Sequence, residues 1–275
     1  MALSEKESHA FQTFEKNGWE DAASPYHRHW GNLSSQSAEP MLDAAQVAKG
    51  SRVLDAATGA GYIAAAAKQR GADAVGIDFS AAQVALARKT YPDITFQWAS
   101  VEALPFEADS FDAVLMGFGM NHLPDPEAAF HEAYRVLKSG GWFAFTVWAA
   151  PRPGEAFGIV LSALEELGAK SVQLPPAPPY FRFADPVEVE KVFGDTGFLN
   201  GTTCIVQQHW RHQSPDALFD AFNEGAVRAT AMLRAQPERA REAIRVASRK
   251  EVEKLKHDGV YVVPGPAALS FAQKP

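Results

Sequence analysis

Between residues 52 and 148 the sequence alternates short apolar runs with helix-forming segments. Such an alternation predicts a mostly parallel β-sheet with helices on both faces. The expected strands are Arg52–Ala56, Ala74–Ile77, Ile94–Trp98, Phe111–Met116 and Trp142–Trp148, and the expected helices are Ile63–Arg70, Ser80–Thr90 and Pro126–Leu137.

The segments outside this region are expected to be mainly helical. Residues 1–31 carry aromatic side chains at helix-like intervals, and residues 40–49 are predicted to form a helix that begins near Pro40 and stops at Gly50. After residue 148 we expect helices at Glu155–Leu167 and Pro186–Phe193, a strand at Thr202–Trp210, a long helical region at Pro215–His257, and a last strand within Gly259–Lys274.

Composition limits the classes of partner. The 275 residues carry a net charge of −7, which argues mildly against nucleic acid as a partner. The single cysteine, Cys204, excludes an intrachain disulfide, and its apolar neighbours predict a buried strand residue. The sequence shows no signal-peptide pattern and no apolar run of membrane-spanning length. We expect a cytoplasmic protein without membrane insertion, and a homo-oligomer remains possible.

The segment Asp55–Gly61 joins the first strand to the first helix. Gly59 and Gly61 allow the backbone to approach a ligand closely, and the free N–H groups of the next helix suit an anion. Asp78 ends the second strand, where an acid can accept hydrogen bonds from a ribose diol. The loop therefore predicts nucleotide binding. It also fits the dinucleotide pattern G-x-G-x-x-G/A, so a nicotinamide cofactor and a purely structural turn stay open.

Further segments resemble one family. The motif Val53-Leu54-Asp55-x-x-Thr58-Gly59-x-Gly61-Tyr62, with three later segments in matching order, resembles the class I S-adenosylmethionine-dependent methyltransferases, in particular the group of ubiquinone/menaquinone C-methyltransferases. An acid before the glycines suits a ligand with a positive amino group. The later segments are Gly76-Ile77-Asp78-Phe79-Ser80, Leu104-Pro105-Phe106 with Ser110-Phe111-Asp112, and Phe118 to Gly141.

The resemblance implies a Rossmann-like, doubly wound α/β sheet of seven strands in the order 3-2-1-4-5-7-6, with the last strand antiparallel. S-adenosylmethionine is the implied cofactor, bound at the carboxyl ends of the strands. We expect an N-terminal helical lid at residues 1–39, a cofactor-binding core at 40–150, and a remainder at 151–275 whose helical insertions form a substrate cap.

The resemblance also assigns cofactor contacts. Asp55, Thr58, Gly59 and Gly61 are expected to flank the methionine end, Asp78 to hold the ribose, and Phe79 to pack on the adenine. Ser100 stands where many relatives have an aspartate, and a neutral hydroxyl gives a weaker hydrogen bond. The other expected contacts are Tyr26, Gln83, Val101, Glu102 and Gly117.

The expected reaction is in-line methyl transfer to a small apolar or aromatic molecule, for which a general base is optional. His122 is the candidate base, and the run Tyr26–Trp30, which contains His27 and His29, is a second cluster. A metal site is not expected, since the histidines lack carboxylate partners at ligand spacing. Two alternatives remain, a protein of the same fold that does not methylate and an NAD(P)-dependent oxidoreductase. Phe157, Tyr180, Phe181 and Trp210 are candidates for the substrate wall.

Overall fold

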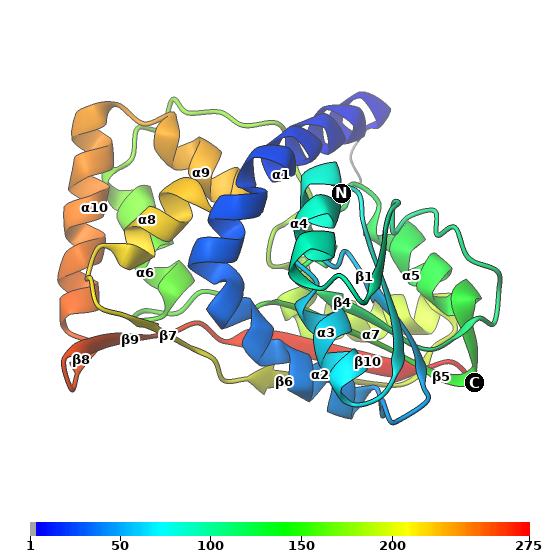
Figure 1. Ribbon diagram of the computed structural model, residues 1–275. Coiled ribbons are helices and arrows are strands. Elements are labelled where there is room, and N and C mark those ends of the chain that lie inside the picture. Colours follow the sequence, from blue (N-terminus) through cyan, green and yellow to red (C-terminus); the bar gives the residue numbers. More distant parts are fainter. Residues whose placement is uncertain (1–3) are drawn as a thin grey trace.

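Seven strands form the central sheet, in the order β3-β2-β1-β4-β5-β10-β6 (Figure 1). The computed structural model describes residues 4–275. β10 lies antiparallel between β5 and β6, whereas the strands from β3 to β5 are parallel. The predicted strand order is therefore confirmed, with β10 as its seventh strand. The strands are β1 (Arg52–Ala56), β2 (Asp73–Asp78), β3 (Thr95–Trp98), β4 (Phe111–Gly117), β5 (Leu137–Trp148), β6 (Leu199–Val206) and β10 (Ala267–Gln273).

Helices cover both faces of this sheet. Successive side chains of a strand point to opposite faces, so Val53 of β1 packs with α2 (Ala38–Ala44) and α3 (Tyr62–Gln69), while Leu54 packs on the side of α5 (Pro126–Val136) and α7 (Pro186–Thr196). α4 (Ala81–Thr90) lies beside α3. The arrangement confirms the doubly wound α/β class.

α1 (Glu5–Ser34) runs between the sheet and a second group of helices, as Figure 1 shows. Pro25 lies inside this helix, and a proline there removes one backbone hydrogen bond and bends the helix axis. The second group consists of α6 (Ala156–Leu167), α8 (Ala217–Glu224), α9 (Val227–Arg234) and α10 (Glu238–Glu253). A smaller sheet, in the order β7-β9-β8, lies next to them and is formed by β7 (His209–His212), β8 (Lys256–His257) and β9 (Val260–Pro264).

The structure differs from the sequence predictions in four places. The strand expected at Thr202–Trp210 is divided between β6 and β7, which belong to different sheets. The helix expected at residues 40–49 ends at Ala44. Cys204 is exposed, because β6 is the edge strand and pairs only with β10. The long helical region after Pro215 is interrupted at Gly225 and near Pro237.

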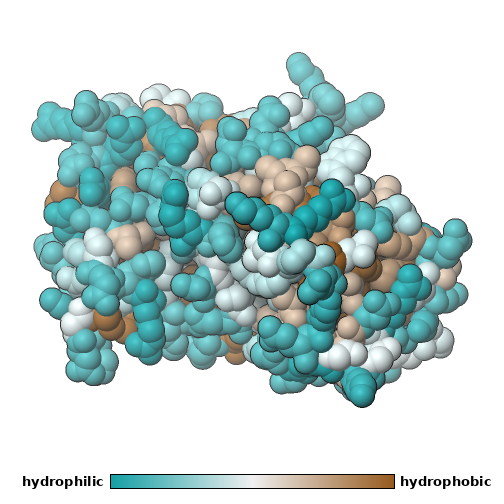
Figure 2. All heavy atoms as spheres, viewed as in Figure 1, coloured by the Kyte–Doolittle hydropathy of each residue, from teal (hydrophilic) through white to brown (hydrophobic). Residues whose placement is uncertain are grey.

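The face drawn in Figure 2 is mostly hydrophilic, and apolar side chains gather on it only in small groups. Among residues 4–275, no helix combines the length and the apolar character needed to cross a membrane.

Candidate active site

Two adjoining cavities lie beneath α1. The first has a volume of about 410 Å³ and lies at the carboxyl ends of β1, β2, β3 and β4, where open α/β sheets bind their ligands. The second has a volume of about 190 Å³ and lies between α1, α6 and α9. Four side chains line both cavities: Trp19, Tyr26, Phe118 and His122. Each of these four side chains can therefore contact a ligand in either cavity.

Asp55 supports the glycine loop from below. Its Oδ2 accepts hydrogen bonds from the Thr58 hydroxyl (2.6 Å) and from the Ala64 N–H (2.9 Å). Asp55 is fully buried, and burial raises its pKa to about 7. Asp55 and Thr58 are not among the side chains that line the first cavity. They hold the loop and the start of α3 in place.

The two glycines of the loop face different surroundings. A Cβ on Gly59 would find only the Gln83 Oε1, at 4.0 Å, and Gly59 lines the first cavity. A Cβ on Gly61 would lie 2.8 Å from Cζ of Phe96 and 3.0 Å from Cδ2 of Tyr91. Gly59 therefore leaves room in the cavity, whereas Gly61 leaves room for the protein's own core. Both have a positive φ, +53° and +89°, which disfavours other residues.

Asp78 stands in the cavity wall at the end of β2. Its Oδ2 accepts from the Gly59 N–H and its Oδ1 from the Ser80 N–H, both at 2.9 Å. Burial raises the pKa of Asp78 to about 6, against the effect of these two donors. Each oxygen keeps a lone pair for a ligand. The nearby Gln83 Oε1 is buried and has no hydrogen-bond partner among residues 4–275.

An aromatic surface and a turn lie beyond Asp78. Trp98 at the end of β3 is 63% exposed, lines the cavity, and donates from Nε1 to the Phe79 carbonyl (2.7 Å). The Ser100 hydroxyl accepts from the Glu102 N–H (3.2 Å), so it caps the turn that follows β3. An aspartate could cap the same turn and keep a second oxygen for a ligand. The serine caps the turn and keeps only a neutral hydroxyl, not a carboxylate oxygen, for a ligand. Phe79, Ser100, Val101 and Glu102 all line this part of the cavity.

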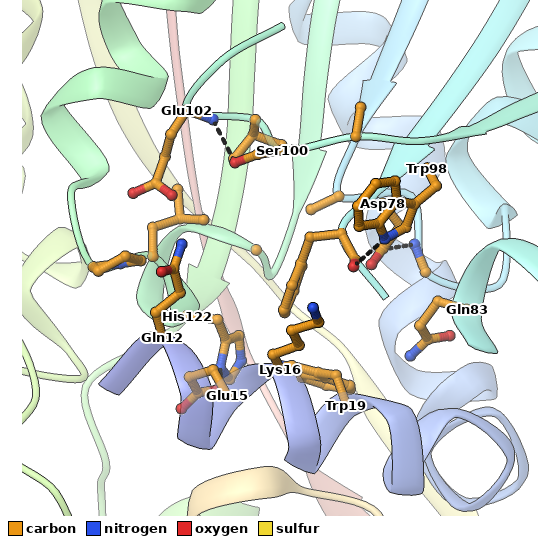
Figure 3. Close-up of a pocket in the computed structure, with 18 of the residues that line it drawn as sticks. Gln12, Glu15, Lys16, Trp19, Asp78, Gln83, Trp98, Ser100, Glu102 and His122 are labelled. Carbon is orange, nitrogen blue, oxygen red and sulfur yellow. Dashed lines mark hydrogen bonds and ion pairs between the residues drawn. The ribbon is translucent and has the colours of Figure 1, made fainter. Parts of the chain in front are cut away.

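α1 supplies the opposite wall and a carboxylate. Glu15 is 2% exposed, and its Oε2 lies 2.9 Å from Nδ1 of His122 (Figure 3). Since a carboxylate only accepts, this contact places a proton on Nδ1 and leaves Nε2 as the basic atom. The Asn121 Nδ2 lies 3.2 Å from Nε2. The result is a histidine oriented by a buried acid and facing both cavities.

The second cavity has mainly aromatic and aliphatic walls. Phe157, Tyr180 and Phe181 line it, as expected from the sequence. Trp210 is instead a core residue, 2% exposed and packed on Trp30 with ring centres 4.7 Å apart. One cation, Arg228 of α9, also lines this cavity.

The structure brings most of the expected site residues together around the first cavity. It is lined by Tyr26, Gly59, Asp78, Phe79, Gln83, Ser100, Val101, Glu102, Gly117 and His122, whereas Asp55, Thr58 and Gly61 of the glycine loop do not line it. The two histidines of the second cluster point elsewhere: His27 contacts the Tyr62 hydroxyl, and His29 pairs with Glu224 of α8.

Glu15, Trp19, Trp98 and Arg228 were not identified as site residues from the sequence. Glu15 did leave a signal, since it follows Phe11 and precedes Trp19 at intervals of four residues, and the stripe is otherwise apolar. A carboxylate in the buried stripe of a helix needs a partner.

Comparison with known proteins identifies the central segment. Residues 54–145 match the family model described as a methyltransferase domain. This segment of the chain is therefore similar to a methyltransferase domain. A demethylmenaquinone methyltransferase from Thermus thermophilus is 41% identical over 115 residues, which are 40% of this chain and 52% of the relative. The chain spans about half the length of the curated relatives it matches.

Solved structures share the fold around this methyltransferase domain. Phosphoethanolamine N-methyltransferase 2 from Haemonchus contortus, solved with S-adenosyl-L-methionine, has a TM-score of 0.59 and 18% identity, and covers 96% of this chain and 60% of its own. The [4+2]-cyclase SpnF has a TM-score of 0.50 and 19% identity, and covers 87% of this chain and 80% of its own. At these identities the likeness concerns the fold alone.

Proposed function

We propose that the protein is an S-adenosylmethionine-dependent methyltransferase acting on a small aromatic or apolar molecule. The observation that carries the proposal is the first cavity, where Gly59 and Asp78 of the methyltransferase domain face the same space. Residues 1–39 would act as a lid on the core at 40–150, and residues 151–275 would complete the substrate cap. The names of the curated relatives support methyl transfer to a quinone-type ring.

The residues of the first cavity fit the cofactor. Gly59 offers space that a Cβ would fill, the Asp78 carboxylate can accept from ribose hydroxyls, and the unpartnered Gln83 Oε1 is a free acceptor. Phe79 and Trp98 offer aromatic surface to the adenine. When bound, S-adenosylmethionine supplies an electrophilic methyl group. The chain's own task is to orient the acceptor and to exclude water around it.

His122 is the proposed general base, and Glu15 is its positioning residue. Methylation of an O–H, N–H or C–H acceptor releases one proton, and Nε2 of His122 is the atom that takes it. An acceptor hydroxyl would displace the Asn121 amide, which lies 3.2 Å from this nitrogen. Glu15 holds the ring through Nδ1 and stabilises the imidazolium that forms.

The test is the release of S-adenosylhomocysteine with a panel of phenols, hydroquinones and amines. We expect turnover of at least one aromatic acceptor. His122→Gln should lower kcat by about 10²- to 10⁴-fold, the usual range for a general base, with little change in S-adenosylhomocysteine affinity. Glu15→Gln should lower kcat by a smaller factor. The double variant should have the same kcat as His122→Gln alone, because the two residues act as a unit.

A specific observation also favours a second function on the same fold. Ser100 caps its turn without offering a carboxylate to the adenine, and the likeness in fold extends to a cyclase. Binding of S-adenosylmethionine with no methyl transfer to any acceptor, together with conversion of a substrate in its presence, would favour this non-methylating alternative.

A further inference from the structure

The position of Arg228 in the structure disfavours a positive charge. It is the second residue of α9, and the positive end of the helix dipole disfavours a positive charge there. Its surroundings in the second cavity are apolar, with Trp30, Phe157 and Phe181 among the walls. Burial lowers the pKa of Arg228. Neither helix stability nor solvation accounts for a cation at this position.

The guanidinium group is only partly used by the protein. Its Nη2 donates to the Pro175 carbonyl (3.0 Å), while Nη1 is buried and has no hydrogen-bond partner within residues 4–275. Glu15 lies near enough to favour the charged form of Arg228, but its carboxylate is engaged by His122. A buried, unpaired N–H group costs free energy. Because Arg228 lines the second cavity, a ligand that enters it meets a guanidinium group with one unpaired nitrogen.

We propose that the second cavity binds an aromatic or apolar substrate that carries a carboxylate, and that Arg228 recognises this carboxylate. The planar guanidinium matches a carboxylate better than a lysine ammonium would. The aromatic walls take the body of the substrate. The carboxylate end is held at Arg228, and His122, which lines both cavities, faces the part that reaches the cofactor. This inference rests on the proposed function, whose acceptor class it narrows.

The experiment compares two probes of the same size and shape, one with a carboxylate and one with a neutral amide. 2-Naphthoate and 2-naphthamide share one ring system, and each is titrated into the full chain by calorimetry, with and without saturating S-adenosylhomocysteine. The wild-type protein should bind 2-naphthoate about tenfold or more tightly than 2-naphthamide, as one charge-assisted hydrogen bond can provide. Arg228→Gln should remove this preference, and Arg228→Lys should keep part of it.

Arg234→Gln is the matched control. Arg234 belongs to the same helix, and its side chain is exposed and donates to the Asn223 carbonyl, so this variant should keep the wild-type preference. Circular dichroism and thermal melting verify that each variant is folded.

Three results overturn the proposal: equal binding of the two probes to the wild type, binding of neither, or a preference that survives Arg228→Gln. If the proposed function is wrong, the protein should not bind S-adenosylhomocysteine, and this result is distinct from the three above. The preference for 2-naphthoate is measured in both conditions.

Discussion

Gly59 and Gly61 are two residues apart in one loop, yet the structure requires them for different reasons. The space beside Gly59 belongs to the first cavity, and the space beside Gly61 is filled by Phe96 and Tyr91. A pattern of glycines alone suggests that both permit approach of a ligand. The structure assigns that task to Gly59 and a packing task to Gly61.

Two single substitutions separate these tasks. Of the two variants, Gly59→Ala should cause the larger loss of S-adenosylhomocysteine affinity, because the added methyl group enters the cavity. Gly61→Ala should cause the larger fall in melting temperature. Its Cβ would lie 2.8 Å from the Phe96 ring, and its positive φ is strained for alanine. Calorimetry and thermal melting of both variants provide the comparison. Equal losses of affinity and of stability in the two variants would contradict the assignment.

At the scale of elements, α1 is attached to the core through Glu20, which caps the N-terminus of α4. The Glu20 carboxylate accepts from the Ala81 N–H (2.7 Å) and the Ala82 N–H (3.1 Å), the first two donors of α4. The Ser80 hydroxyl accepts from the Gln83 N–H, the third donor. Thus α1 completes the N-terminus of α4, directly beside Asp78, and this contact holds the cavity wall in place.

Removal of the Glu20 charge should loosen α1. Glu20→Ala removes a capping interaction of a kind that contributes about 0.5–2 kcal/mol, so backbone hydrogen exchange in α1 and in the first turn of α4 should accelerate. Asp21→Asn is the control, because Asp21 is an exposed acid of the same helix. Unchanged exchange in Glu20→Ala, or equal acceleration in the control, would exclude this role for Glu20.

The central elements were predictable because their signals are local. β1 has its predicted bounds, Arg52–Ala56, whereas α3 differs from prediction by one residue at each end and α4 by one residue at its start. The contribution of α1 to the cavity wall was harder to predict from the sequence. Glu15 meets His122 across 107 residues, and Glu20 meets α4 across about 60, so their roles depend on tertiary contacts. Arg228 lies in a charged helical region whose pattern is typical of a solvated face, and only the fold places it against a cavity.

At the scale of the whole molecule, two buried acids couple stability to pH. Asp55 and Asp78 have pKa values raised to about 7 and about 6, so the folded state binds their protons more tightly than the unfolded state does. Their contribution to stability is present below pH 4 and is lost as the pH rises through these values.

The variant Asp78→Asn isolates one of these groups. As the pH rises from 4 to 7, the cofactor-free variant should gain stability relative to the wild type, because only the wild type must then carry a buried charge at this position. Urea unfolding of both proteins across this range measures the difference. A difference that stays constant with pH would show that Asp78 does not titrate in this range.

The central claim is that the cavity beneath α1 binds S-adenosylmethionine. The most direct measurement is calorimetric titration of the full chain with S-adenosylhomocysteine, and with NADH as the competing cofactor. We predict binding of one S-adenosylhomocysteine per chain, weakened by Gly59→Ala and by Asp78→Asn, and no binding of NADH. Heat with NADH and none with S-adenosylhomocysteine would contradict the account.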